Sequence, residues 1–202
     1  MQKNYETALP AGYAPAHVID VKNKKTGVAL NAAGGVVIVA ATALAVFIIR
    51  PAGFMEHFSF VKYFIVIAAL FAYFVLHELA HGAAYKLLTG QKLTFGLTAM
   101  AAFCGVPQIY VYRKTALISL LTPFTVFTLL FGGAALLLPD AWDKTYAAFL
   151  LACHWGGCAG DLYDTFLFLF RFRSPKTLMK DTGPKQTIYI KTEPPAAPEE
   201  NI

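Results

Sequence analysis

The sequence is short of charge and of cysteine. Only 14% of its 202 residues are Asp, Glu, Lys or Arg, against about a quarter in ordinary soluble domains. Its three cysteines are too few for a disulfide framework, and we expect them to behave as small buried hydrophobic residues. No basic helix and no patch of interleaved basic and aromatic residues lies outside the apolar runs, which argues against a nucleic-acid partner.

Apolar residues take the place of the missing charge. They make up 57% of the chain and give it a mean hydropathy of +0.53. They are concentrated in four segments, each long enough for a helix to cross a bilayer, residues 28–49, 60–88, 115–138 and 145–170. The sequence therefore predicts an all-α polytopic membrane protein, a multi-pass protein of the cell membrane with four transmembrane helices in the lipid bilayer.

The distribution of cations predicts the topology. Residues 1–27 are polar and basic and lack the apolar core of a signal peptide, so we expect a cytoplasmic N-terminal segment. Residues 28–172 form the expected transmembrane domain, and residues 173–202 a cytoplasmic tail that is partly disordered. The loop between the second and third segments is also basic, whereas the other two loops are not, and the positive-inside rule then places both termini in the cytoplasm.

The loop at residues 92–112 is the least helical part of the transmembrane region. It alternates around Leu93, Phe95 and Leu97, turns at "CGVP", and resumes as "QIYVY". This pattern predicts a short β-hairpin or re-entrant loop between the second and third helices. Irregular backbone at membrane depth must be buried by protein or face a wet cavity, so the hairpin is expected to line a polar cavity; a plain interfacial loop fits the sequence nearly as well.

The second apolar segment contains "HELAH", the HExxH pattern, at residues 77–81. On a helix His77 and His81 lie one turn apart on the same face, so both imidazoles can bind one Zn²⁺. Glu78 lies beside that face and can act as general base on a metal-bound water. A proton relay or a structural polar cluster would use the same residues, but ionisable groups inside a membrane are rare and usually functional.

A catalytic zinc site needs a third protein ligand, and the fourth apolar segment offers His154, Cys158, Asp161 and Asp164. Counted along the helix at about 1.5 Å per residue, His77 lies about 22 Å from Lys62 and Asp161 about 26 Å from Lys144, so the two share a depth. Asp161 is therefore the predicted third ligand.

The other polar residues of this segment have weaker claims. His154 could hydrogen-bond the scissile carbonyl as a catalytic group, orient Asp161, or make a plain interhelical hydrogen bond. Cys158 could assist or replace Asp161, and Asp164 is expected to be solvated near the cytoplasmic end. Asp161 could alternatively pair with Arg113 or Lys86.

These motifs resemble those of a known family. The resemblance rests on HExxH in an expected transmembrane helix, Pro123-Phe124 in the next such helix, and then His154, Gly160-Asp161 and Asp181-Thr182-Gly183. On these motifs the chain resembles the putative zincin peptidases, a group of small bacterial membrane proteins. That group is similar to the site-two intramembrane metalloproteases, in which the later aspartate stands in an Asp-Gly context; here the order is Gly-Asp. The resemblance covers about residues 60–189 and implies zinc-dependent cleavage of peptide bonds in or near the membrane.

The sequence therefore predicts an intramembrane zinc metalloprotease. Its site would hold Zn²⁺ through His77, His81 and Asp161, with Glu78 as base. Its partner would be a transmembrane or membrane-associated protein substrate, and the sequence leaves substrate identity and oligomeric state open. Two other classes use the same residues, a non-catalytic zinc-binding membrane scaffold and a small metal- or proton-linked carrier. The intact Glu78 argues against the scaffold, and the lack of an internal repeat against the carrier.

Overall fold

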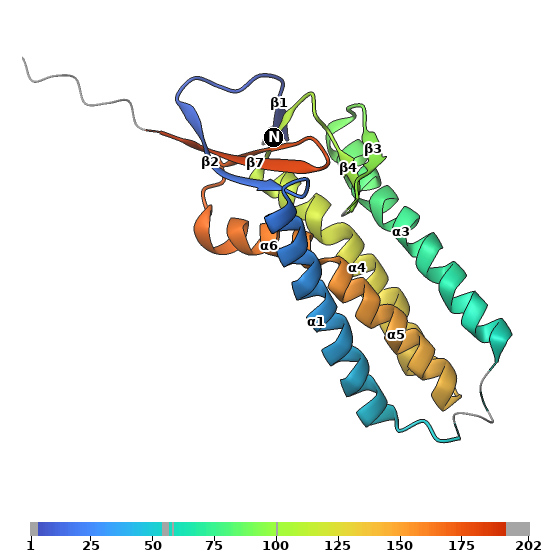
Figure 1. Cartoon of the computed structure of the whole chain (residues 1–202). Coiled ribbons are helices and arrows are strands. Elements are labelled where there is room, and N and C mark those ends of the chain that lie inside the picture. The colour runs from blue at the N-terminus through green and yellow to red at the C-terminus, as the bar shows by residue number, and fades with distance from the viewer. Residues whose placement is uncertain (1–3, 54–56, 58, 100, 193–202) are drawn as a thin grey trace, which may run out of the picture.

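The structure is a computed structural model that describes residues 4–53, 57, 59–99 and 101–192. It consists of a bundle of helices with a β-sheet across one end (Figure 1). Both the first strands and the last strands of the chain belong to this sheet, so the two ends of the described chain lie at the same end of the bundle.

Three helices are long and apolar enough to cross a membrane: α1 (Lys24–Ile49), α3 (Phe60–Thr89) and α4 (Arg113–Leu137). Ser59 caps the start of α3, and Gly90, with a φ of 68°, ends it in the left-handed conformation typical of glycine. The outer faces of these helices expose large apolar side chains, among them Val36, Val39, Phe47, Phe60, Phe64, Phe71 and Leu129. Exposed apolar surface of this extent is expected of helices that face lipid.

The prediction of four transmembrane helices is wrong. The expected fourth helix, residues 145–170, is broken into α5 (Ala141–Gly157), α6 (Ala159–Phe166) and a π-helical turn, η1 (Leu167–Arg171). The break falls at Cys158, directly after Gly156 and Gly157, and α6 lies crosswise to α5 beneath the sheet (Figure 1). Hydropathy summed along the chain cannot register such a break, because the apolar residues continue through it.

The all-α prediction is also wrong. Five strands form an antiparallel sheet in the order β1-β5-β6-β7-β2. Their bounds are β1 (Tyr5–Glu6), β2 (Tyr13–Asp20), β5 (Tyr110–Tyr112), β6 (Leu178–Asp181) and β7 (Lys185–Lys191). Pro15 is tolerated in β2 because β2 is an edge strand, and the register with β7 shifts between Pro15 and His17.

The hairpin at residues 92–112 is present in its first half only. Strands β3 (Thr94–Leu97) and β4 (Ala102–Gly105) pair with each other as a separate two-stranded sheet. The "QIYVY" stretch does not extend this hairpin: it supplies β5 to the five-stranded sheet.

The sheet and the crosswise helix share one apolar core. Val106, Ile109, Met179 and Ile188 are fully or almost fully buried in it, together with Phe168 of η1. The hairpin is fastened to this core where Gly105 meets Gly183: a Cβ on Gly105 would lie 2.4 Å from the backbone nitrogen of Gly183. Only glycine allows this close approach. Strand β4 also lies against α3, the helix that carries the histidines described next.

Candidate metal centre

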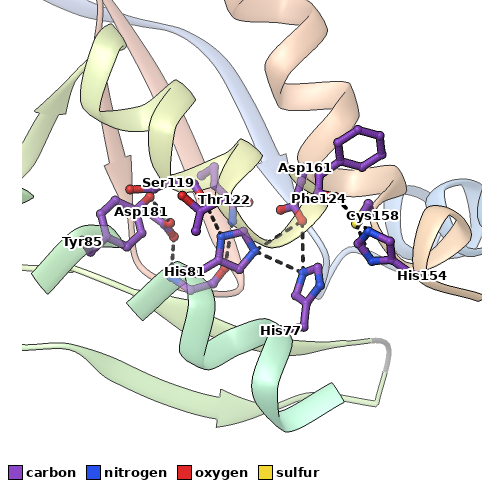
Figure 2. A network of polar contacts seen from close by, with 12 residues as sticks. His77, His81, Tyr85, Ser119, Thr122, Phe124, His154, Cys158, Asp161 and Asp181 are labelled. Carbon is purple, nitrogen blue, oxygen red and sulfur yellow. Dashed lines mark hydrogen bonds and ion pairs between the residues drawn. The ribbon is translucent and has the colours of Figure 1, made fainter. Parts of the chain in front are cut away.

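The two histidines of the HExxH motif lie together on the buried face of α3. Their Nε2 atoms are 3.2 Å apart, as the i and i+4 spacing predicts (Figure 2). Both side chains are nearly buried, each 7% exposed as a residue, although they lie on a helix whose other side chains mostly face outward. They therefore point into the protein, which the metal-site prediction requires.

Asp161 meets both histidines from α6. Its Oδ2 lies 3.2 Å from Nε2 of His77 and 3.3 Å from Nε2 of His81. The break at Cys158 makes this contact, because it starts a new helix whose first turn carries Asp161. The alternative partners of Asp161 are engaged elsewhere: Arg113 donates to the Phe168 carbonyl, and Lys86 donates to the Gly90 carbonyl.

Pro123 explains the orientation of His81. A proline inside a helix has no N–H to offer the carbonyl four residues earlier, here the carbonyl of Ser119 in α4. That oxygen lies 2.9 Å from Nδ1 of His81. Because a carbonyl can only accept, Nδ1 carries the proton, and the Nε2 of a neutral His81 presents a lone pair.

A longer chain of hydrogen bonds orients His77. Nε2 of His154 lies 3.1 Å from the Phe124 carbonyl, so it donates, and Nδ1 of a neutral His154 accepts. The Tyr73 hydroxyl lies 3.0 Å from Nδ1 of His154 and 3.0 Å from Nδ1 of His77. The hydroxyl must donate to His154 and accept from His77, which leaves Nε2 of His77 without a proton.

These hydrogen bonds leave Nε2 of His77 and Nε2 of His81 without a proton, next to a carboxylate oxygen of Asp161. The three atoms form a cluster of lone-pair donors. One ligand atom each from His77, His81 and Asp161 lies within 4.8 Å of the others. Two imidazole nitrogens and a carboxylate oxygen repel one another unless a cation lies between them, and this donor set suits Zn²⁺. The residues present therefore fit the predicted metal.

Glu78 lies beside this cluster, at the wall of a cavity of about 160 Å³. The backbone of Cys104 in β4 lies next to its carboxylate. Residues of α1, α3, β4 and α6, together with the β6–β7 turn, line the cavity, and His77, His81 and Asp161 are among them. Glu78 is thus placed to face anything that enters the cavity next to the metal ligands.

His154 and Cys158 lie behind the cluster. His154 is fully buried among Tyr73, Phe124 and Phe127, and it is not among the described residues that line the cavity. Cys158 contacts His154, with 3.5 Å from Sγ to Nδ1. Ligand atoms of His77, His154 and Cys158 also lie within 4.8 Å of one another, but Nδ1 of His77 is on the far side of its ring from Asp161, so a metal held there would be a second site.

Two further carboxyl groups line the cavity. Asp164, which we expected to be solvated, is only 3% exposed, because α6 lies under the sheet. Asp181 of β6 accepts hydrogen bonds from the Tyr85 hydroxyl, at 2.7 Å, and from the Gly183 N–H, at 2.8 Å. Burial raises the pKa of Asp181 to about 6, while these two bonds act in the opposite direction.

Sequence reasoning missed two of these residues, Tyr73 and Tyr85, and named Asp181 without giving it a role. Tyr73 stands four residues before His77, and Tyr85 four residues after His81, so the helical period that pairs the histidines could have found both. Asp181 belongs to the Asp-Thr-Gly motif, whose glycine donates to its aspartate and forms the turn that meets β4.

Residues 70–176 match the model of a protein family described as putative zincin peptidase. This match covers more than half of the 202 residues. The chain belongs to the putative zincin peptidase family. The matched segment contains His77, Glu78, His81, Asp161 and the orienting groups Tyr73, Pro123 and His154, whereas Asp181 lies outside it. No curated protein and no solved structure matches the chain. Family membership suggests a zinc metallopeptidase.

Proposed function

We propose that this member of the family is an intramembrane zinc metalloprotease of the site-two type, which hydrolyses peptide bonds of transmembrane or membrane-associated proteins. The observation that carries the proposal is the convergence of the His77, His81 and Asp161 ligand atoms from two helices. Hydrogen bonds at Nδ1 of each histidine keep the proton there and leave Nε2 free to bind a metal. The family match supports the peptidase class.

Zinc held by His77, His81 and Asp161 would polarise a carbonyl and lower the pKa of a bound water. Glu78 acts as the general base: its carboxylate accepts a proton from that water and delivers it to the leaving nitrogen. Glu78 and Cys104 line the same cavity wall. His154 is a positioning residue in this scheme, because it reaches His77 only through Tyr73.

The location of the centre supports action at a membrane. The two ligand histidines lie on α3, one of the three helices able to cross a bilayer, in the half of that helix nearer the sheet. We place both termini in the cytoplasm, since the basic segments lie at the sheet end. The site then lies towards the cytoplasmic side of the bilayer.

The outer edge of β4 gives a means of holding the substrate. A helical substrate hides its carbonyls in its own hydrogen bonds, so the cut segment must first unwind. Ala102, Phe103 and Cys104 line the cavity, and β4 pairs with β3 alone among the described strands. An unwound segment could therefore add to β4 as a strand beside Glu78.

The decisive test separates metal binding from proteolysis. Zinc content of protein purified in detergent should approach one ion per chain, and His77→Ala or Asp161→Ala should remove most of it, whereas the matched control Asp143→Ala, at the other end of the bundle, should not. Glu78→Gln should keep the zinc and abolish cleavage of synthetic transmembrane peptides. Cleavage that survives Glu78→Gln would refute the mechanism, and zinc that survives Asp161→Ala would refute the ligand set.

A further inference from the structure

The cavity beside the metal centre is acidic in a basic protein. The chain carries a net charge of +5, with 17 lysines and arginines, yet none of the described residues that line the cavity is a lysine or an arginine. Four carboxyl groups line it: Glu78, Asp161, Asp164 and Asp181. A divalent metal would balance two of them at most, which leaves two carboxyl groups in the cavity wall with no basic side chain among the described lining residues.

Asp164 has one carboxyl oxygen without a hydrogen-bond partner in the part of the chain that the structure describes. It stands three residues after Asp161, on the same side of α6, and is 3% exposed. Its Oδ1 is buried and has no hydrogen-bond partner among the described residues. Burial, with Asp161 and Asp181 nearby, raises the pKa of Asp164, because the ionised carboxylate has no partner there among the described residues. A ligand that brings a positive charge and a donor to this carboxyl would offset the free-energy cost.

Asp181 faces the same cavity but is held in place. Both of its oxygens accept hydrogen bonds from the protein, from Tyr85 and from Gly183. Neither Asp164 nor Asp181 belongs to a group of three ligand atoms close enough to hold a metal ion among the described residues. The missing partner is therefore better supplied by an organic cation, whose N–H groups need no coordination shell.

We infer that the cavity binds a lysine or arginine side chain of the substrate close to the bond that is cut, with Asp164 as its direct partner and Asp181 as a second negative charge. This inference rests on the proposed peptidase function. Membrane proteins carry lysine and arginine where their helices leave the bilayer on the cytoplasmic side. A centre at that depth meets such residues.

Two measurements test this subsite. In the first, zinc-loaded full-length protein cleaves a library of apolar peptides with randomised positions after the helical stretch, and mass spectrometry maps the cut bonds. Lysine and arginine should be enriched at least about tenfold within two residues of the cut. Asp164→Asn, which removes the charge at nearly constant volume, should abolish the enrichment, and the control Asp143→Asn should preserve it.

In the second, Glu78→Gln protein binds fluorescent peptides that differ only in lysine against norleucine, a side chain of similar length without charge. The lysine peptide should bind at least about tenfold more tightly, and Asp164→Asn should equalise the two. This comparison needs no change at Asp164, so it stands even if that variant misfolds.

The outcomes are distinct. Equal binding of the two peptides, or cleavage without enrichment of basic residues, overturns the subsite and leaves the peptidase intact. Absence of any cleavage by the unmodified protein, with preferential binding of the lysine peptide, overturns the peptidase and supports the subsite as a binding site.

Discussion

Replacing Pro123 by alanine should weaken the metal centre while changing the stability of the metal-free protein little. Alanine restores the N–H that the Ser119 carbonyl lacks, so this oxygen returns to the helical hydrogen-bond pattern and leaves His81. A proline in a helix interior costs about 3 kcal/mol relative to alanine. The Pro123 ring is fully buried, and the loss of two of its methylenes lowers the stability by about 1.6 kcal/mol, which opposes that gain. The buried His81 Nδ1–H loses its acceptor at the same time, which costs about 1–3 kcal/mol, so the net change in stability should be small.

The zinc affinity should fall. Groups that orient a ligating histidine contribute about 10- to 100-fold in metal affinity, so Pro123→Ala should weaken zinc binding by about that factor. Thermal unfolding of the metal-free protein and zinc titration against a competing chelator, both in detergent, measure the two effects. Gly133→Ala is the matched control: it lies in the same helix, a Cβ there meets nothing within 4 Å, and it should stabilise without changing zinc affinity. Zinc binding within about threefold of the unmodified protein would refute the role of the freed carbonyl.

The remaining predictions concern the other supports of the site. Tyr73→Phe removes the hydroxyl between His77 and His154 and should weaken zinc binding about tenfold by the same titration, while Tyr63→Phe on the exposed part of α3 should not; equal affinities would exclude the relay. Ala102→Pro removes a backbone donor from the outer edge of β4 and should leave the zinc content unchanged while cleavage falls at least about tenfold; unimpaired cleavage would exclude strand addition. Asp181 has a folded pKa of about 6 against an ordinary 3.8, so the stabilisation it contributes is complete below about pH 3.8 and is lost as the pH rises through 6. Asp181→Asn should therefore remove about 2 kcal/mol of the decrease in unfolding free energy of the metal-free protein between pH 4 and pH 7, and denaturation curves that fall in parallel for both proteins would contradict this.

Much of the candidate site could be read from the sequence. His77 and His81 lie on one face because the helical period is local, and Asp161 was found by counting helical rise from the cations that mark the membrane boundary. The structure brings Asp161 to 3.2 Å from His77 although the helix that the count assumed is broken, because α5 alone carries the chain most of the way to the level of His77.

The fold was read less completely. The sequence predicted a hairpin, and β3 and β4 form it, but it did not predict the five-stranded sheet. Strand β1 has two residues and β5 three, too few to show an alternating pattern, and β5 takes its partners from residues 5–6 and 178–179. Pairings between segments so far apart leave no periodic signal along the chain.

The sequence by itself determined that the chain carries long apolar helices and that one of them presents two histidines and a glutamate suited to zinc, because hydropathy and the 3.6-residue period are properties of consecutive residues. Only the tertiary structure decided which protons the histidines keep, since the acceptors that hold them, the carbonyls of Ser119 and Phe124, are backbone atoms of another helix. Only the tertiary structure, too, buried Asp164 and left its Oδ1 without a hydrogen-bond partner among the described residues, because the burial of a side chain depends on the elements that pack over it and not on its neighbours in the chain.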